Sequence, residues 1–80
     1  MIVVYILYSR SLKKYYVGQS SNLKDRLERH NSGRSRYTKL GIPWELKYEF
    51  CCSTRSEAMR LERKIKKRGA QRFIDDLFGV

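Results

Sequence analysis

The stretch Ile2-Val3-Val4-Tyr5-Ile6-Leu7-Tyr8 decides how this chain folds. It is β-branched and aromatic without a polar interruption, and the polar residues Ser9-Arg10-Ser11 follow it directly. A short apolar run with such a boundary is typical of a strand that is buried on both faces. The run is much shorter than the roughly 18 apolar residues that a membrane span needs. We therefore expect it to be the central strand of a sheet, in a protein that does not enter a membrane.

Two further strands are predicted along the chain. Tyr15-Tyr16-Val17-Gly18 comes after a connection that is short enough for an antiparallel hairpin. From residue 44 onward, an alternating pattern is typical of a half-buried strand, with every second position being Trp44, Leu46, Tyr48, Phe50 and Cys52. The sequence therefore predicts three strands.

The hairpin has a predicted register. If it turns about the midpoint of Ser11 and Leu12, Tyr16 faces Leu7. Because side chains alternate along a strand, Tyr16 then lies diagonal to Tyr5 on one face of the sheet. We expect both phenol groups to be within reach of one water molecule.

A first helix is predicted between the second and third strands. Asn22 can cap it, with Asp25 as the third helical residue and Gly33 at its end. The helical spacing places three side chains on one face: Leu23, Leu27 and His30. Residues 34–43 have no clear period and are predicted to form a basic loop or a short turn-rich segment.

Two more helices follow the third strand. Thr54 or Ser53 can cap the first of them, and Gly69 stands just past its end. Its predicted inner stripe consists of Ala58, Leu61 and Ile65. The last helix, from about Gln71 to Leu77, is expected to bury Phe73, Ile74 and Leu77. The order ββαβαα predicts an α+β fold, with a three-stranded antiparallel sheet flanked by helices.

Size and charge restrict the function. A chain of 80 residues is expected to form one domain over 1–80. Its 18 Lys and Arg residues against 8 Asp and Glu give a net charge of +10, which favours a nucleic-acid partner, DNA first, with RNA not excluded. Two other interpretations of the charge remain: it serves solubility alone, or the chain is a small structural protein that binds ribosomal RNA. Cys51 and Cys52 are adjacent and make neither a disulfide framework nor a zinc site, so we expect a reducing, cytoplasmic location.

Few residues are suited to catalysis. The chain has one His and lacks both a cluster of carboxylates for two metal ions and a Gly-rich phosphate loop. Six Tyr residues are the unusual feature, although Tyr8, Tyr15 and Tyr48 fit core positions on strands.

Five short motifs occur in an order that is specific as a set. Val3-Val4-Tyr5 is followed by Tyr16-Val17-Gly18, then by Asn22-Leu23-Lys24-Asp25-Arg26-Leu27 and His30-Asn31, and finally by Glu62 within residues 56–66. In this order the chain resembles the GIY-YIG nuclease family over nearly its whole length. Within that family it is most similar to small single-domain bacterial members related to the nuclease half of excision-repair incision proteins. Val3 departs from the pattern, since the family has glycine there.

The resemblance implies a metal-dependent DNA endonuclease. It implies hydrolysis of phosphodiester bonds with one divalent cation, Mg²⁺ or Mn²⁺, held by Glu62. Magnesium is commonly held by one carboxylate, waters and a substrate phosphate, so the ion is expected to bind weakly without DNA. The alternative interpretation of Glu62 is that it only forms an ion pair with Lys66, one helical turn later.

The other catalytic candidates are Tyr5, Tyr16, Arg26 and His30. The guanidinium group of Arg26 can bind the scissile phosphate, or it is a solvated helix arginine. His30 can contact phosphate or assist the base, or it is a packed imidazole. Tyr5 and Tyr16 are the proposed activating pair, because a nearby metal and cations would lower the pKa of a phenol. Which tyrosine is the base stays open.

Nucleic-acid contacts are expected from the basic segments. The candidates combine cations with one aromatic ring: Lys24, Arg34, Arg36, Tyr37 and Lys39. A plain basic loop is the alternative for residues 34–39.

We expect the flanks of the first two helices to meet the tyrosines on one face of the sheet, in a shallow basic cleft. Cleavage would be structure-selective, with branched or damaged DNA as substrates, or only weakly selective, and a protein partner is one source of targeting. The rival function is a non-catalytic basic nucleic-acid-binding module on the same fold.

Overall fold

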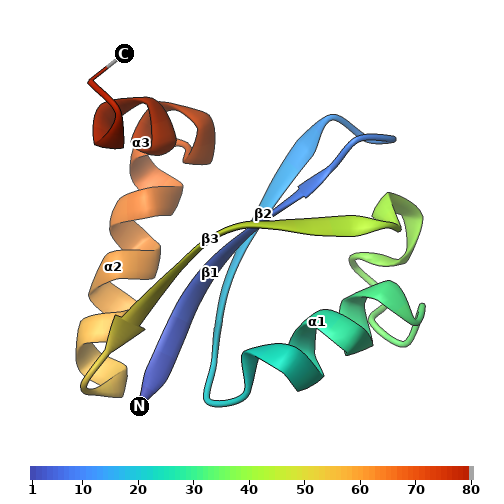
Figure 1. The fold of residues 1–80 in the computed structure, drawn as a ribbon, viewed down its shortest axis with the longest axis horizontal. Coiled ribbons are helices and arrows are strands. Elements are labelled where there is room, and N and C mark those ends of the chain that lie inside the picture. Colours follow the sequence, from blue (N-terminus) through green and yellow to red (C-terminus); the bar gives the residue numbers. More distant parts are fainter. Residues whose placement is uncertain (80) are drawn as a thin grey trace.

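Strands and helices follow one another in the predicted order. In the computed structural model, which describes residues 1–79, the strands are β1 (Ile2–Ser9), β2 (Lys14–Ser20) and β3 (Trp44–Cys52). The α-helices are α1 (Leu23–Asn31), α2 (Arg55–Arg68) and α3 (Ala70–Leu77), and a 3₁₀ turn, η1 (Lys39–Gly41), comes before β3. The α+β fold with the order ββαβαα is therefore confirmed (Figure 1).

The sheet has β1 at its centre. Its strand order is β2-β1-β3, and both pairs are antiparallel. Leu7 lies opposite Tyr16, which is the register predicted for the hairpin. Because β2 has β1 as a neighbour on one side only, its other edge is free to meet side chains that come from either face of the sheet.

The helices cover opposite faces of the sheet. α2 and α3 pack on the face that carries Val4 and Ile6, while α1 packs on the face that carries Tyr5 and Leu7 (Figure 1). Our expectation that the flanks of α1 and α2 share one face is therefore wrong. The reason is that β1 is aliphatic or aromatic at every position from Ile2 to Tyr8, so both of its faces must be covered, and each face is covered by different helices.

A β-bulge divides β3 between the two faces. Tyr48 lies opposite Ile6 and Leu46 lies opposite Leu7, so one β3 residue, Lys47, has no partner on β1. Trp44 therefore packs with Tyr5 on the α1 face, and the single half-buried pattern predicted for β3 is wrong at this point. A bulge shifts every side chain on one side of it to the other face.

Caps fix the ends of the helices as the sequence indicates. The side chain of Asn22 accepts a hydrogen bond from the backbone of Asp25, and Thr54 does the same for Glu57, both at 3.1 Å. Gly69 ends α2 and leads into α3. Its φ of 96° is costly for residues with a side chain, which favours glycine at this position.

The last helix buries less than expected. Phe73 and Ile74 pack against the core, but Leu77 is 49% exposed, so its predicted burial is wrong. Leu77 lies in the final turn of α3, and Phe73 and Ile74 already occupy the space against the sheet. Within residues 1–79, none of the helices has the length and apolar character needed to span a membrane.

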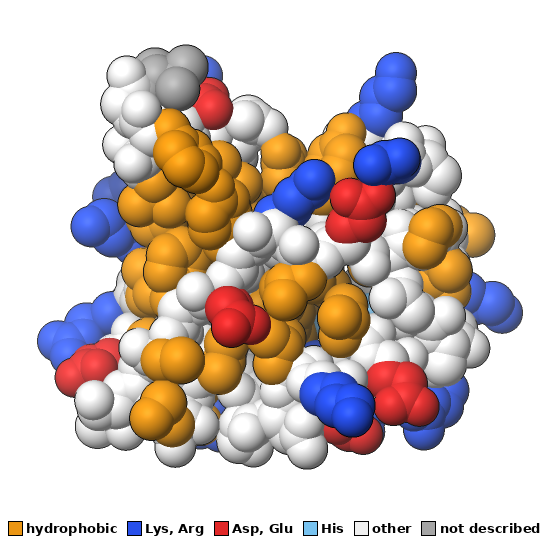
Figure 2. Space-filling model, viewed as in Figure 1, with side chains coloured by type: hydrophobic (Ala, Val, Ile, Leu, Met, Phe, Trp, Pro, Cys, Tyr) orange, Lys and Arg blue, Asp and Glu red, His pale blue; other side chains and the backbone are white. Residues whose placement is uncertain are grey.

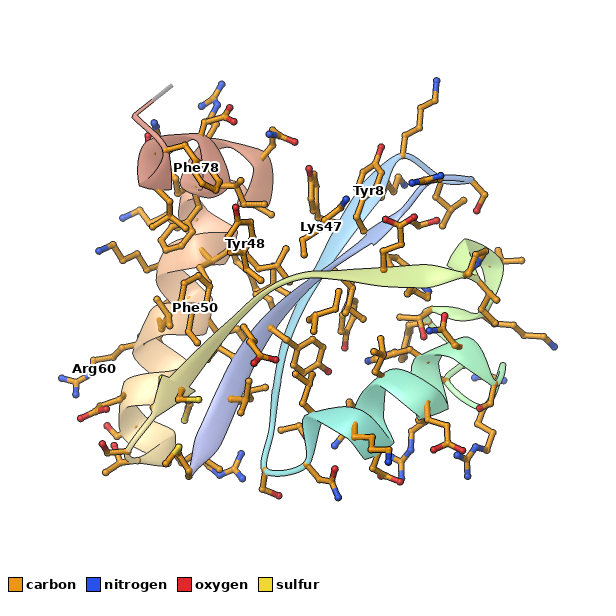
Figure 3. The ribbon with its side chains drawn as sticks, viewed as in Figure 1. Tyr8, Lys47, Tyr48, Phe50, Arg60 and Phe78 are labelled. Carbon is orange, nitrogen blue, oxygen red and sulfur yellow. The ribbon has the colours of Figure 1, made fainter. Side chains whose placement is uncertain are left out.

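Hydrophobic side chains gather on the surface over β3 and α3 (Figure 2), and Figure 3 labels three aromatic ones among them, Tyr48, Phe50 and Phe78. The rings of Tyr48 and Phe78 lie 5.9 Å apart, and Phe50 meets Phe73 edge to face at the same distance. Tyr48 is half-buried and packs against the core, as the sequence predicts.

Candidate active site

The phenol of Tyr5 lies over the backbone of β2. Tyr5 is directly opposite Gly18, and a Cβ atom built at Gly18 would be 2.6 Å from the Tyr5 hydroxyl. No real side chain tolerates such a contact. Gly18 therefore makes the room that lets the hydroxyl reach the edge of the sheet, in agreement with the close approach that a strand glycine predicts.

Gly18→Ala should displace this hydroxyl. We expect a loss of unfolding free energy of about 1–3 kcal/mol, because overpacking a filled site has that typical cost. Urea denaturation measures it. In the double variant Gly18→Ala with Tyr5→Phe the hydroxyl contact is gone and only the ring-carbon contact at 2.8 Å is left, so the two losses should not fully add. Strictly additive losses would contradict the contact.

A buried chain of hydrogen bonds begins at Tyr5. Its hydroxyl lies 3.1 Å from Nε2 of His30, and Nδ1 of His30 lies 2.8 Å from Oγ1 of Thr38. All three residues are at most 2% exposed. The backbone oxygen of Thr38 also accepts a hydrogen bond of 2.6 Å from the indole of Trp44. The imidazole of His30 is therefore fixed at both nitrogens.

Burial sets the protonation of this chain. Burial, followed by the neighbouring Tyr16, raises the pKa of Tyr5 to about 12, with Arg26 lowering it and Glu62 raising it by smaller amounts. Burial, followed by Arg26 and Arg29, lowers the pKa of His30. Our expectation that nearby cations lower the pKa of the Tyr5 phenol is therefore wrong for the protein alone, because desolvation outweighs them. At neutral pH, Tyr5 holds its proton and His30 is uncharged.

The lowered pKa of His30 makes stability depend on pH. The unfolded chain binds a proton near pH 6.5, whereas the folded chain resists it, so this contribution is complete above pH 6.5 and is lost as pH falls through the folded pKa. We expect the melting temperature to fall between pH 7.5 and pH 5. His30→Gln should remove that part of the slope, and an unchanged slope would contradict the assignment.

Tyr16 lies on the same side as this chain. Its ring centroid is 6.4 Å from that of Tyr5 and 4.9 Å from that of His30. The predicted diagonal placement of the two tyrosines on one face is therefore confirmed. Tyr16 is half-buried and borders the surface, so it can reach a ligand outside the protein.

Arg26 projects from α1 toward the same group. It is half-buried, and its charge acts on the pKa values of both Tyr5 and His30. Among residues 1–79 no ion pair includes Arg26. Its guanidinium group is therefore free to meet an anion.

Glu62 approaches from the other face of the sheet. Nε2 of Gln19 donates to its Oε1 at 3.2 Å, and Nζ of Lys66 donates to its Oε2 at 2.8 Å. Glu62 and Lys66 thus form the ion pair that the alternative interpretation of Glu62 predicts. Its charge also raises the pKa of Tyr5, but by less than burial, Tyr16 or Arg26 change it. Its hydrogen bond to Gln19 thus places Glu62 against β2, on the face opposite the Tyr5–His30 chain and not in one concave face with it.

The donor set around Glu62 fits a weakly held divalent ion. Residues 1–79 contain no group of three or more His, Cys, Asp or Glu side chains that could hold a metal. Glu62 offers one carboxylate beside a pocket of ≈ 300 Å³ that Gln19, Met59, Arg63 and Lys66 also line. Magnesium accepts one carboxylate with several waters, so these residues fit it, with Lys66 as a competitor for Oε2.

The predicted nucleic-acid-binding residues are all exposed: Lys24, Arg34, Arg36, Tyr37 and Lys39. Tyr37 is 90% exposed. Buried Thr38 connects this loop to His30, so the exposed cations of residues 34–39 are held beside the Tyr5–His30 chain.

Two polar residues of the site were not assigned from the sequence. Thr38 sits within a segment that has no periodicity, and only the fold shows that it is buried there. Gln19 links Glu62 to Arg55, whose Nη1 donates to Oε1 of Gln19 at 3.2 Å. Alternation along β2 from Val17 would have placed Gln19 on the α2 face.

The sequence is similar to those of several bacterial proteins. A UPF0213 protein of Bacillus licheniformis is 35% identical over 65 residues, which cover 76% of this chain and 67% of the relative. A UPF0213 protein of Staphylococcus haemolyticus is 42% identical over 52 residues, covering 64% of this chain and 63% of the relative. The chain thus spans about two thirds of the length of these relatives. No solved structure matches the chain.

The family itself is shown by a longer match. The sequence model of the GIY-YIG catalytic domain matches residues 1–73, which include Tyr5, Tyr16, Arg26, His30 and Glu62. The match covers most of the 80 residues. The chain belongs to the GIY-YIG family, a family of nucleases.

Proposed function

We propose that residues 1–80 act as one nuclease domain that hydrolyses phosphodiester bonds of DNA with a single divalent cation, Mg²⁺ or Mn²⁺. The observation that carries the proposal is that neighbouring residues of β2 hold the two groups: Tyr5 packs over Gly18, and Glu62 is hydrogen-bonded to Gln19. The hydroxyl lies over Gly18 and bonds to His30, and the carboxylate acts on it from the other face. A chain that can accept a proton and a carboxylate that can hold a cation thus lie on the two faces of β2, at neighbouring residues, which supports the proposal.

The Tyr5–His30 pair supports activation of water without a free phenolate. Tyr5 donates its proton to Nε2 of His30, while its oxygen accepts a proton from the attacking water. The resulting hydroxide forms a bond to phosphorus, the bond from phosphorus to the leaving sugar oxygen breaks, and that oxygen takes a proton from solvent. His30 can accept the proton because it starts uncharged.

The remaining residues have roles that follow from their charge and position. Arg26 binds the phosphate oxygens and offsets the negative charge of the transition state. Tyr16 orients the water or hydrogen-bonds the phosphate. Glu62 is the metal ligand, and a bound divalent ion would supply Lewis-acid polarisation of the phosphate there. Lys24 and the exposed loop of residues 34–39 hold the DNA backbone.

A cleavage panel tests the function. Single-stranded, duplex, flapped and four-way DNA are incubated with Mg²⁺, Mn²⁺ or a chelator, with RNA equivalents alongside. We expect metal-dependent cleavage of DNA, greatest on branched forms. Binding of DNA without cleavage of any form would favour the rival function, a non-catalytic binding module, which the ion pair of Glu62 with Lys66 also supports. Cleavage of RNA alone would contradict the DNA assignment.

Arg26→Ala should lower turnover more than affinity. Removing one group that stabilises transition-state charge typically costs about a hundredfold or more in rate. Single-turnover kinetics separate the rate of bound substrate from its dissociation constant. Arg29→Ala, an exposed change in the same helix, is the matched control. A change confined to affinity would move Arg26 into the general basic surface.

A further inference from the structure

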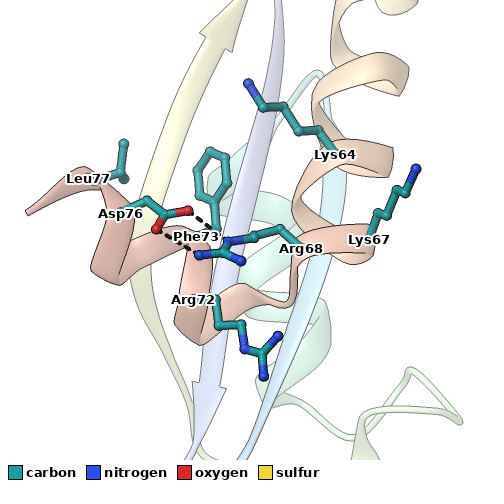
Figure 4. A pocket seen from close by; sticks show the side chains of 7 residues that line it. All are labelled: Lys64, Lys67, Arg68, Arg72, Phe73, Asp76 and Leu77. Carbon is teal, nitrogen blue, oxygen red and sulfur yellow. Dashed lines mark hydrogen bonds and ion pairs between the residues drawn. The ribbon is translucent and has the colours of Figure 1, made fainter. Parts of the chain in front are cut away.

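A basic pocket, separate from the pocket beside Glu62, lies between the C-terminal half of α2 and the helix α3 (Figure 4). Its volume is ≈ 620 Å³. We call it the α2–α3 groove, and it is lined by Lys64, Lys67, Arg68, Arg72, Phe73, Asp76 and Leu77. None of these residues belongs to the candidate active site.

The groove has an excess of positive charge. Arg68 is held by Asp76 through two hydrogen bonds, of 2.8 and 3.0 Å, which Figure 4 shows as dashed lines. Within residues 1–79, no ion pair includes Lys64, Lys67 or Arg72. One carboxylate thus faces four cations, and three of these are available to an anion.

The groove and the candidate site lie on different sides of α2. Glu62 and Lys66 point to the β2 edge, where they are bonded to each other. A helix turns about 100° per residue, so Lys64 lies about 200° around α2 from Glu62. A phosphate bound in the groove is therefore not the phosphate beside Tyr5.

Apolar side chains line the groove together with the cations. Phe73 stands between Arg68 and Leu77 in Figure 4, and Leu77 is 49% exposed. Aromatic and apolar surface next to cations suits an unpaired nucleotide, whose base stacks while its phosphate pairs with Lys or Arg. An acidic peptide would satisfy the cations but would leave the apolar wall without a planar partner.

We propose that the α2–α3 groove binds an unpaired segment of a nucleic-acid strand, outside the segment that is cut. Phosphates lie at Lys64, Lys67 and Arg72, and one base lies against Phe73 and Leu77. The volume is within the range of pockets that hold a ligand of this size. The inference rests on the proposed function for the identity of the partner. It deepens that function, because two sites on different sides of α2 would favour substrates that join duplex and single-stranded parts.

The test measures binding without divalent metal, so that no cleavage occurs. Fluorescence anisotropy compares a blunt 16-base-pair duplex with the same duplex carrying a six-nucleotide single-stranded extension. For the unmodified protein we expect the extension to raise affinity about tenfold or more, since stacking of one base has that value. The variant Lys64→Gln with Lys67→Gln should lose this gain. The matched control is Lys13→Gln with Lys14→Gln, which removes the same charge from two exposed residues where the hairpin turn enters β2, and it should keep the gain.

Each outcome of this binding test either supports or overturns the proposal for the α2–α3 groove. An extension gain that survives Lys64→Gln with Lys67→Gln, or that falls equally in the control, overturns the groove. Competition by a glutamate-rich peptide of equal charge, as strong as that by the free extension strand, overturns the nucleotide assignment. If the gain is lost in the groove variant while the blunt duplex is still cut in Mn²⁺, the groove is supported and hydrolysis is independent of it. If the gain behaves as expected but no DNA is ever cut, only the proposed hydrolysis fails.

Discussion

Glu62→Gln should reduce metal-dependent cleavage by at least about a hundredfold while DNA binding stays nearly intact. The change removes the charge of the only carboxylate assigned to the cation, and such a cation supplies several kcal/mol of transition-state stabilisation. It leaves all 18 basic residues in place, so the electrostatic part of binding is kept. Single-turnover cleavage in Mn²⁺ and anisotropy without metal measure the two effects.

The control for this variant is Glu49→Gln, an exposed change on β3 at the other edge of the sheet. It alters the net charge equally and should cleave at the parent rate. Equal rates for Glu62→Gln and the parent protein would remove Glu62 from the metal site and leave it as the partner of Lys66.

Tyr5→Phe should have the second large effect. It removes the hydroxyl that connects the attacking water to Nε2 of His30, and proton transfer of this kind typically contributes about 10²–10⁴ in rate. We expect a loss in that range, with little change in DNA affinity, because Tyr5 is 2% exposed and offers almost no surface to the backbone.

Folding must be measured alongside, since the change leaves a nitrogen of His30 without its partner at a typical cost of about 1–3 kcal/mol. Tyr8→Phe, on the same strand, is the matched control and should leave the rate unchanged. A Tyr5→Phe protein that is folded and cleaves normally would exclude the proton pathway through His30.

Local features of the fold could be predicted because their causes are local. Asn22 and Thr54 cap helices through atoms three residues away, and the register of Leu7 against Tyr16 follows from the position of one turn. These interactions need no knowledge of the rest of the chain.

The layout of the candidate site depends on contacts that are distant in sequence. The bulge at Lys47 turns Trp44 toward Tyr5, and Trp44 then fixes Thr38, which in turn holds His30. The hydrophobic periodicity of β3 gives no sign of an extra strand residue, so this series of contacts could not be predicted from the sequence. The same holds for the placement of α1 and α2 on opposite faces, which puts Glu62 on the face opposite the Tyr5–His30 chain.

The central claim is metal-dependent hydrolysis, and the direct measurement is cleavage of a flapped duplex in ¹⁸O-labelled water, followed by mass spectrometry of the product phosphate. With Mn²⁺ or Mg²⁺ we expect cleavage and one ¹⁸O atom in the new terminal phosphate, and with a chelator we expect neither. DNA that is bound with metal present but remains uncut, or product phosphate without the label, would contradict the account.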